Sequence, residues 1–225
     1  MKKNVSLLQL ENNPQIGMYF IATDDFVLCG KLLQEEEKKQ IENVLNVPII
    51  HFTCYNSEII GVFIKVDIYN KNFYVPNDLH EEELKLLKEL CDTFNYLIIQ
   101  ISSNNNALGN LIASTPNSLI ISHELKKNLK EIERKSKKDV HILNDENYHQ
   151  AGALIYSSNS KTLASSLLDN ISLEKIEREI DGISTINNGS AYLSSGIVAN
   201  SNGILIGDIT TSVEVQTILE KLDYL

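Results

Sequence analysis

The sequence predicts an α/β fold of five similar units, each about 45 residues long, that close into a ring. Five of the ten glycines recur at separations of 44, 48, 43 and 44 residues, and they are Gly17, Gly61, Gly109, Gly152 and Gly196. Each glycine is followed by two short apolar runs with a turn between them, and then by an amphipathic helix. Five such periods account for all 225 residues. The internal repeat therefore predicts the architecture.

The third unit shows the pattern most clearly. Residues 111–113 and 119–121 are apolar runs on either side of a turn centred on Pro116, which predicts two antiparallel strands. From Glu124 the spacing changes, because Leu125, Leu129 and Ile132 recur every three or four residues. That spacing predicts a helix with one apolar face. The other units have turns near 23–25, 70–72, 158–160 and 200–203, and predicted helices at 35–46, 80–91, 172–181 and 212–222.

Closing strands follow four of the five helices, at 51–55, 97–101, 140–143 and 183–186. Nothing follows the fifth helix, whereas an unassigned strand at 5–10 precedes the first glycine. We infer that this N-terminal strand completes the fifth unit and covers the edge that an open array would expose. The expected organisation is a single domain over 1–225, with the strand at 1–10 and repeats near 11–57, 58–104, 105–147, 148–191 and 192–225.

Composition restricts the partners and the compartment. The net charge is −10, from 30 acidic and 20 basic residues, which disfavours a protein that grips nucleic acid through phosphate contacts and suits a basic protein partner. The three cysteines form no CxxC pair, which is typical of buried thiols in a reducing compartment. No apolar run is long enough for a signal peptide or a membrane span, so we expect a cytoplasmic protein.

Motifs for cofactor or metal chemistry are missing from the sequence. It has neither a dinucleotide fingerprint nor a P-loop. His80-Glu81 and His123-Glu124 begin like HExxH, but Leu84 and Lys127 replace the second histidine. The five histidines show no ligand spacing with a cysteine, so we expect neither a metal nor a cofactor. Residues 210–212, Thr-Thr-Ser, are most simply a loop and a helix cap.

Several short motifs, taken in order along the five units, resemble the translation initiation factor 6 family, which has the pentein fold. They are Glu11-Asn12-Asn13 with Ile16-Gly17, Val75-Pro76-Asn77, Ala107-Leu108-Gly109-Asn110, Asn188-Gly189-Ser190, and Gly207 with Thr210-Thr211. The length is similar to that of the archaeal branch. One departure is that the family's usual GxDTT is Gly207-Asp208-Ile209-Thr210-Thr211 here, so Ile209 occupies the place of the aspartate.

The resemblance implies a non-enzymatic factor that binds the large ribosomal subunit on its inter-subunit face, and because the ring closes on itself we expect a monomer. There it would sterically prevent premature association with the small subunit, in initiation or in large-subunit biogenesis. The implied partners are the universal L14 protein, neighbouring L24e and nearby ribosomal RNA, with no DNA and no membrane. The family's contact surface implies two loops, one carrying Leu108 and Asn110 and the other Thr210 and Thr211.

The repeat itself also predicts a binding face. The segment before each glycine joins a closing strand to the next unit, so all five segments should emerge on one side of the ring. That side would gather polar residues able to bind a protein, namely Asn12, Asn13, Asn56, Asn106, Asn110 and Ser194. The alternative for these asparagines is that they only form turns.

A second function from another class is a pentein guanidino-group hydrolase or amidinotransferase. Enzymes of that kind resemble one another in taking a cysteine nucleophile from the last unit. Residues 191–225 contain no cysteine and no histidine, which disfavours this alternative.

Overall fold

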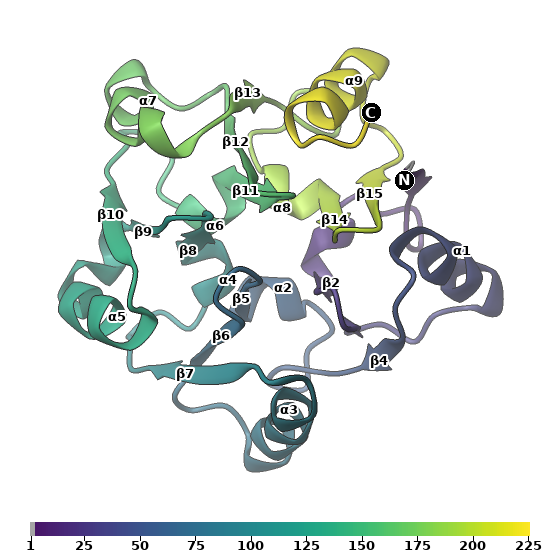
Figure 1. Cartoon of the computed structure of the whole chain (residues 1–225), viewed down its shortest axis with the longest axis horizontal. Helices are drawn as coiled ribbons and strands as arrows, with labels where there is room; N and C mark the ends of the chain where they lie inside the picture. Colours follow the sequence, from purple (N-terminus) through teal and green to yellow (C-terminus); the bar gives the residue numbers. More distant parts are fainter. Residues whose placement is uncertain (1–2) are drawn as a thin grey trace.

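The computed structural model describes residues 3–225, which form five three-stranded sheets arranged as a ring (Figure 1). In each sheet the central strand pairs antiparallel with one neighbour and parallel with the other. Four sheets run in chain order: β2 (Phe20–Ala22), β3 (Val27–Cys29) and β4 (Ile49–His51); β5 (Lys65–Asp67), β6 (Asn72–Pro76) and β7 (Leu97–Ile101); β8 (Ile112–Ser114), β9 (Ser118–Ser122) and β10 (Asp139–Leu143); β11 (Ile155–Ser158), β12 (Lys161–Ser165) and β13 (Gly182–Ser184).

The fifth sheet joins the two ends of the chain. It contains β14 (Ile197–Ala199), β15 (Gly203–Gly207) and β1 (Asn4–Leu8). β1 lies parallel to β15, with Asn4 opposite Gly203 and Leu8 opposite Gly207. The N and C labels accordingly lie near each other in Figure 1. Ring closure by the N-terminal strand is confirmed, with the strand shifted from the expected 5–10 to 4–8.

The long helices lie on the perimeter of the ring (Figure 1). They are α1 (Glu35–Leu45), α3 (Glu81–Phe94), α5 (Leu129–Ser136), α7 (Asn170–Ile176) and α9 (Ser212–Lys221). Two differ from the expectation, because 3-10 helix η2 (His123–Asn128) precedes α5 and η3 (Glu177–Glu179) follows α7. The predicted helix at 172–181 ends early because Asp181 lies back on the sheet, where it accepts hydrogen bonds from the Thr162 amide and Lys161.

The repeat glycines lie in short helical turns around the axis, where only the start of a strand was expected. These inner turns are η1 (Ile16–Met18), α2 (Ile60–Phe63), α4 (Leu108–Leu111), α6 (Ala151–Leu154) and α8 (Leu193–Gly196). A Cβ added at Gly109 would lie 2.0 Å from the Gly61 carbonyl oxygen, and one at Gly152 would lie 2.1 Å from that of Gly109. Glycine therefore recurs because neighbouring turns stack backbone to backbone.

The hydrophobic core is divided among the junctions between units. Phe26 and Leu28 of the first unit pack with Phe73 and Leu87 of the second. At the closure, Leu8 lies in one cluster with residues of the first and last units. Each unit therefore covers the apolar flank of its neighbour. At the closure, β1 joins the last unit to the first, so their apolar flanks are covered in the same way. Among the residues described, no helix is both long and apolar enough to cross a membrane.

Candidate binding face and central cavity

The strand directions give the ring two different faces. Helices α1, α3, α5 and α7 each connect two parallel strands, and α9 follows β15, the parallel partner of β1, so all five helices begin at the same face. One face, here called the loop face, contains the N-terminal ends of the perimeter helices and the segments before the inner turns, at 9–15, 52–59, 102–107, 144–150 and 185–192. The other, the hairpin face, contains the hairpin turns and the helix C-terminal ends.

Two of the loop-face segments contain the same tight turn. Isolated bridges join Leu10 to Asn13 and Cys54 to Ser57. The residues between them have left-handed backbones, with φ of 51° and 62° at Glu11 and Asn12 and 56° at both Tyr55 and Asn56. Two successive positive φ angles are typical of a type I′ turn, and asparagine tolerates that region better than most residues. Asn12 and Asn56 thus have a turn-forming role, whatever else they bind.

A buried glutamate fixes the second of these turns. The carboxylate of Glu83, in the first turn of α3, accepts hydrogen bonds from the Tyr55 and Asn56 amides at 2.9 Å and from the Thr53 hydroxyl at 3.1 Å. A helix N-terminus favours a carboxylate at this position. The segment at 52–59 is therefore held against the end of the neighbouring unit's helix.

Glu214 has the corresponding position in α9. It accepts from the Thr185 hydroxyl at 2.6 Å, from the Gly189 and Asn188 amides at 2.8 and 3.2 Å, and from the Thr211 amide and hydroxyl, both at 2.8 Å. Burial by itself would raise the pKa of this carboxyl group, but the hydrogen bonds outweigh burial and lower the pKa to about 2. Thr211 is the N-cap of α9, as the sequence predicted, and its loop is rigidly tied to 185–189.

Five of the predicted contact residues lie on the loop face. Asn12, Asn56 and Thr211 are exposed. Asn13 and Asn106 are half-buried, and their side-chain amides donate to the Tyr19 hydroxyl and to Asp78. Asn12 and Asn56 can offer side chains to a partner directly, the Thr211 hydroxyl is bonded to Glu214, and Asn13 and Asn106 stiffen the loops.

The other four predicted residues point elsewhere. Leu108 is fully buried in the core, and Thr210 is buried and hydrogen-bonded to Asn187. Asn110 and Ser194 line the central cavity, and the Ser194 hydroxyl donates to the carbonyls of Gly152 and Ile155. The physical reason is the inner helical turn, which rotates Leu108, Asn110 and Ser194 away from the loop face. The expectation of a surface position is wrong for Leu108 and Thr210, which are buried, whereas Asn110 and Ser194 are half-buried at the cavity.

Sequence reasoning missed a set of exposed apolar side chains at the N-terminal ends of α7 and α9. Ile209 is 53% exposed, and Val213 is 76% exposed. In the neighbouring unit Leu167 and Ile171 are also exposed. A signal for Val213 was available, because the apolar stripe of α9 runs through Val215, Ile218 and Leu222 and leaves Val213 on the opposite side.

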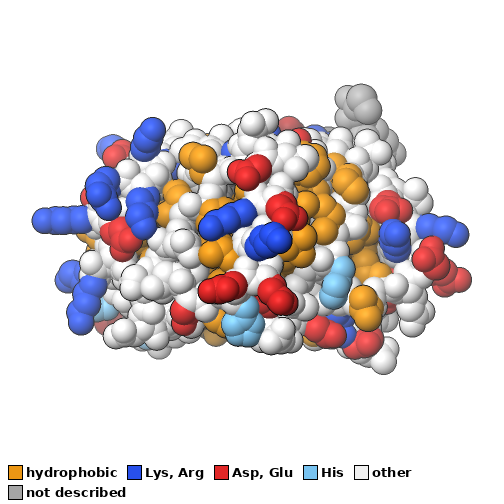
Figure 2. Space-filling view, turned by 90° about the horizontal axis from the view of Figure 1, so that it is seen from below, with side chains coloured by type: hydrophobic (Ala, Val, Ile, Leu, Met, Phe, Trp, Pro, Cys, Tyr) orange, Lys and Arg blue, Asp and Glu red, His pale blue; other side chains and the backbone are white. Residues whose placement is uncertain are grey.

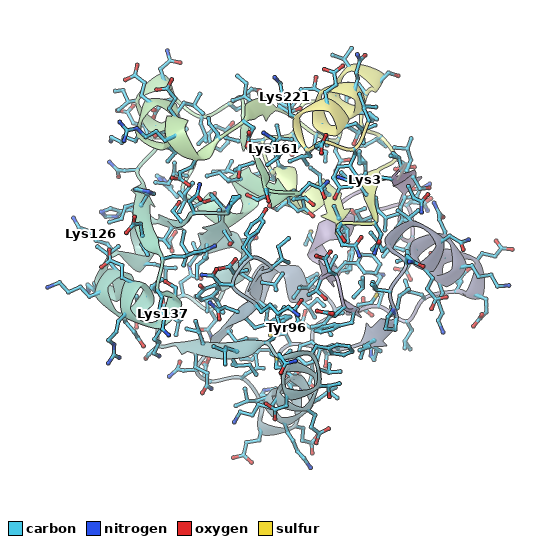
Figure 3. All side chains as sticks on the ribbon, in the orientation of Figure 1. Lys3, Tyr96, Lys126, Lys137, Lys161 and Lys221 are labelled. Carbon is cyan, nitrogen blue, oxygen red and sulfur yellow. The ribbon has the colours of Figure 1, made fainter. Side chains whose placement is uncertain are left out.

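Carboxylates lie in the first turns of several perimeter helices. The first turns of α1 and α3 contain Glu35–Glu37 and Glu81–Glu83, and η2 and α9 contribute Glu124 and Glu214, all on the loop face. On the rim that carries α3, acidic and basic side chains are interspersed with hydrophobic ones (Figure 2). Lys161, Lys221 and Lys3 lie around β12, α9 and β1 (Figure 3). Of these, Lys3 and Lys161 pair with Asp223 and Asp181. The loop face is thus the side on which helix-terminal carboxylates gather.

Comparison with known proteins identifies the family of the chain. The profile of the eIF-6 family matches residues 5–221. The chain belongs to the eIF-6 family. Archaeal proteins named translation initiation factor 6 match it over almost their full lengths. The protein from Pyrococcus horikoshii is 26% identical, with 98% of this chain and 99% of that protein covered. The protein from Methanococcus vannielii is 29% identical, with 92% and 93% covered. The protein from Sulfolobus acidocaldarius is 27% identical, with 92% and 94% covered.

Among solved structures, this eIF-6 family member is similar to a dimethylarginine dimethylaminohydrolase adduct, at a TM-score of 0.42 and 10% identity. The match covers 60% of this chain and half of that chain's length.

The cysteines of this family member are unsuited to nucleophilic attack. Cys29, Cys54 and Cys91 are all buried and unpaired. Burial raises the thiol pKa of Cys29 and Cys91 to about 12 and raises that of Cys54 as well. A thiol must lose its proton to attack, so at neutral pH these three residues are inert. Among the described residues, no group of three or more His, Cys, Asp or Glu side chains is placed to hold a metal ion.

Proposed function

We propose that the chain binds the large ribosomal subunit on its inter-subunit face and sterically prevents premature association with the small subunit. Membership of the eIF-6 family supports this proposal, and so do the curated relatives, which are named translation initiation factor 6. In this role the whole ring acts as one domain and as a monomer in the cytoplasm. It makes and breaks no covalent bond.

The loop face is the surface that we assign to this contact, and one observation carries the assignment. Exposed apolar side chains, Ile209 and Val213, lie beside an anchored loop on the face where the helix-terminal carboxylates gather. Exposed apolar groups rimmed by charge are typical of protein contact sites. The negative rim favours a basic protein surface, and this suits the universal L14 protein, with L24e and ribosomal RNA as neighbours.

Rigidity matters for a factor that acts by exclusion. A protein contact of standard size buries about 800 Å² on each partner. The ring has 10680 Å² of accessible surface, so such a contact leaves most of the molecule free to obstruct the small subunit. The carboxylates of Glu83 and Glu214 hold the loop-face segments in place before binding, which reduces the conformational entropy that binding must overcome.

Sedimentation with purified archaeal large subunits tests the proposal. The wild-type chain should migrate with the large subunit and should reduce the joined-subunit peak when small subunits are added. Val213→Glu places a charge within the assigned contact and should weaken co-sedimentation at least about tenfold. The matched control is Leu97→Glu, because Leu97 is 67% exposed on β7, away from the assigned contact.

Each result has a distinct meaning. If the wild-type chain stays at the top of the gradient with large subunits present, ribosome binding is wrong. If it binds but leaves subunit joining unchanged, steric exclusion is wrong. If Leu97→Glu weakens binding as much as Val213→Glu, the loop face is not the contact.

A further inference from the structure

A partly open cavity of about 110 Å³ lies at the centre of the ring. The inner turns and first strands of all five units contribute to its lining, including Gly17, Gly61, Asn110, Ala153 and Ser194. A site needs only about 10–15 Å³ of such volume to hold one water molecule. The cavity is therefore large enough for several waters or for one small polar molecule.

Among residues 3–225, one charged side chain lines this cavity, and no salt bridge is formed by it. Lys65, on β5, is the charged residue among those that form the wall. The nearest carboxylate that acts on it is Asp67, but both oxygens of Asp67 lie within 3.0 Å of the Lys138 ammonium. Asp67 therefore neutralises Lys138, and the ammonium of Lys65 has no carboxylate within ion-pair distance among the described residues.

The groups around this lysine leave an excess of positive charge. Tyr69 and Tyr156 are the other titratable residues on the wall, and burial raises the pKa of both phenols, so they stay neutral. Behind the wall, Lys138 and Asp67 cancel. Burial also lowers the pKa of Lys65 to about 8, so its side chain is still mostly charged at neutral pH. An unpaired charge in a half-buried site favours a counter-ion.

A second unpaired donor lies on the same wall. Asn110 follows Gly109 in the inner turn α4, and its backbone amide bonds to the Ala107 carbonyl. Its half-buried side chain makes no hydrogen bond to the described residues. The side-chain NH₂ group can therefore donate to a molecule in the cavity.

We propose that the axial cavity is a binding site for a small oxyanion, held by the Lys65 ammonium and the Asn110 amide. An inorganic phosphate or a short carboxylate supplies the negative charge and the acceptor oxygens that these two donors lack. A guanidinium compound carries the same positive charge as the Lys65 ammonium and is repelled by it. The cavity thus selects against the cationic substrates that the pentein enzyme alternative would require.

The test uses the full chain, with inorganic phosphate and sodium acetate as probes and sodium chloride at matched ionic strength as the blank. Calorimetric titration should give one saturable site for at least one probe. At ten times its dissociation constant, that probe should raise the melting temperature by about 3 °C or more. Comparing the two probes distinguishes a tetrahedral anion from a carboxylate.

Three variants locate the site. Lys65→Met should weaken binding at least about tenfold while melting no lower than the wild type, because it removes an unpaired charge. Asn110→Ala should weaken binding several-fold. The matched control is Lys161→Met, whose lysine pairs with Asp181 at 2.8 Å on the outer surface and should leave the affinity unchanged.

The site is overturned if neither probe binds above the chloride blank, which would mean that the cavity holds water only. It is equally overturned if Lys65→Met binds as tightly as the wild type, which would mean adventitious surface binding. Ribosome co-sedimentation of Lys65→Met reports separately on the proposed function, because Lys65 lies away from the loop face.

Discussion

Glu214 offers the sharpest test of how the loop face is held. In Glu214→Gln the side chain keeps its shape, but one of two acceptor oxygens becomes an NH₂ group. The carboxylate accepts three backbone amides, from Asn188, Gly189 and Thr211, and the two oxygens share them. Glutamine therefore leaves at least one of these part-buried amides facing another donor. Such an unsatisfied group costs about 1–3 kcal/mol.

The lowered pKa of Glu214 gives an independent magnitude for the stability that its carboxylate contributes. The pKa of Glu214 is about 2 in the folded chain against a reference value of 4.5. At 1.36 kcal/mol per pKa unit, the difference corresponds to about 3.4 kcal/mol, which solvent screening at the loop face reduces to about 2–3 kcal/mol. Because the folded pKa is the lower one, this stability is present above pH 4.5 and is lost as the pH falls towards 2. More than half of it should be gone by pH 3.

The assay is urea unfolding of the wild type and the variant at pH 7 and at pH 3. Glu214→Gln should be less stable by about 2–3 kcal/mol at pH 7, and the gap should shrink by more than half at pH 3. Glu174→Gln, an exposed glutamate of α7, serves as the control and should change stability by less than about 0.5 kcal/mol. A gap that is equal at both pH values would refute the reasoning, because the stabilisation would then not come from the ionised carboxylate.

Four further predictions concern the ring. Deleting residues 1–10 removes β1 and should lower the melting temperature drastically, which a thermal scan by circular dichroism would show. Gly109→Ala places a Cβ 2.0 Å from a backbone oxygen and should cost about 2–4 kcal/mol in urea unfolding. Lys138→Met leaves the buried Asp67 unpaired and should cost about 3–5 kcal/mol, whereas adding Asp67→Asn should recover part of the loss in a double-mutant cycle. Lys65→Met should gain about 1–3 kcal/mol below pH 8, and the gain should vanish by pH 10.5, because the folded pKa is about 8 and the reference value 10.5.

Each of these predictions has a contrary outcome. A near-wild-type melt of the truncated chain would mean that β1 does not close the ring. An unchanged stability of Gly109→Ala would mean that the inner turns are not packed backbone to backbone. A double variant no more stable than Lys138→Met would mean that the pair is not coupled, and a gain from Lys65→Met that persists at pH 10.5 would not come from its charge.

The sequence alone determined the number of units, their order and the closure of the ring. The repeat makes this possible, because each unit has the same order of a glycine, two strands and a helix. The five units can therefore be aligned with one another, and the alignment gives their bounds. The pattern also showed that the fifth helix lacks a closing strand and that a strand at the N-terminus was unassigned, and β1 lies beside β15. Period and turn chemistry are local properties, so they could be predicted without any tertiary contact.

Only the tertiary structure decided whether the side chain of each loop residue points to the surface, to the core or to the central cavity. Leu108 and Asn110 belong to one segment of the sequence, but the inner turn buries the first and turns the second towards the axis. Glycine stacking around that axis creates this turn, and no pattern within a single unit encodes contacts with the next one. For the same reason Asp67 and Lys138, 71 residues apart in the sequence, pair only in the folded chain, and Lys65 lines the cavity without an ionic partner among the described residues.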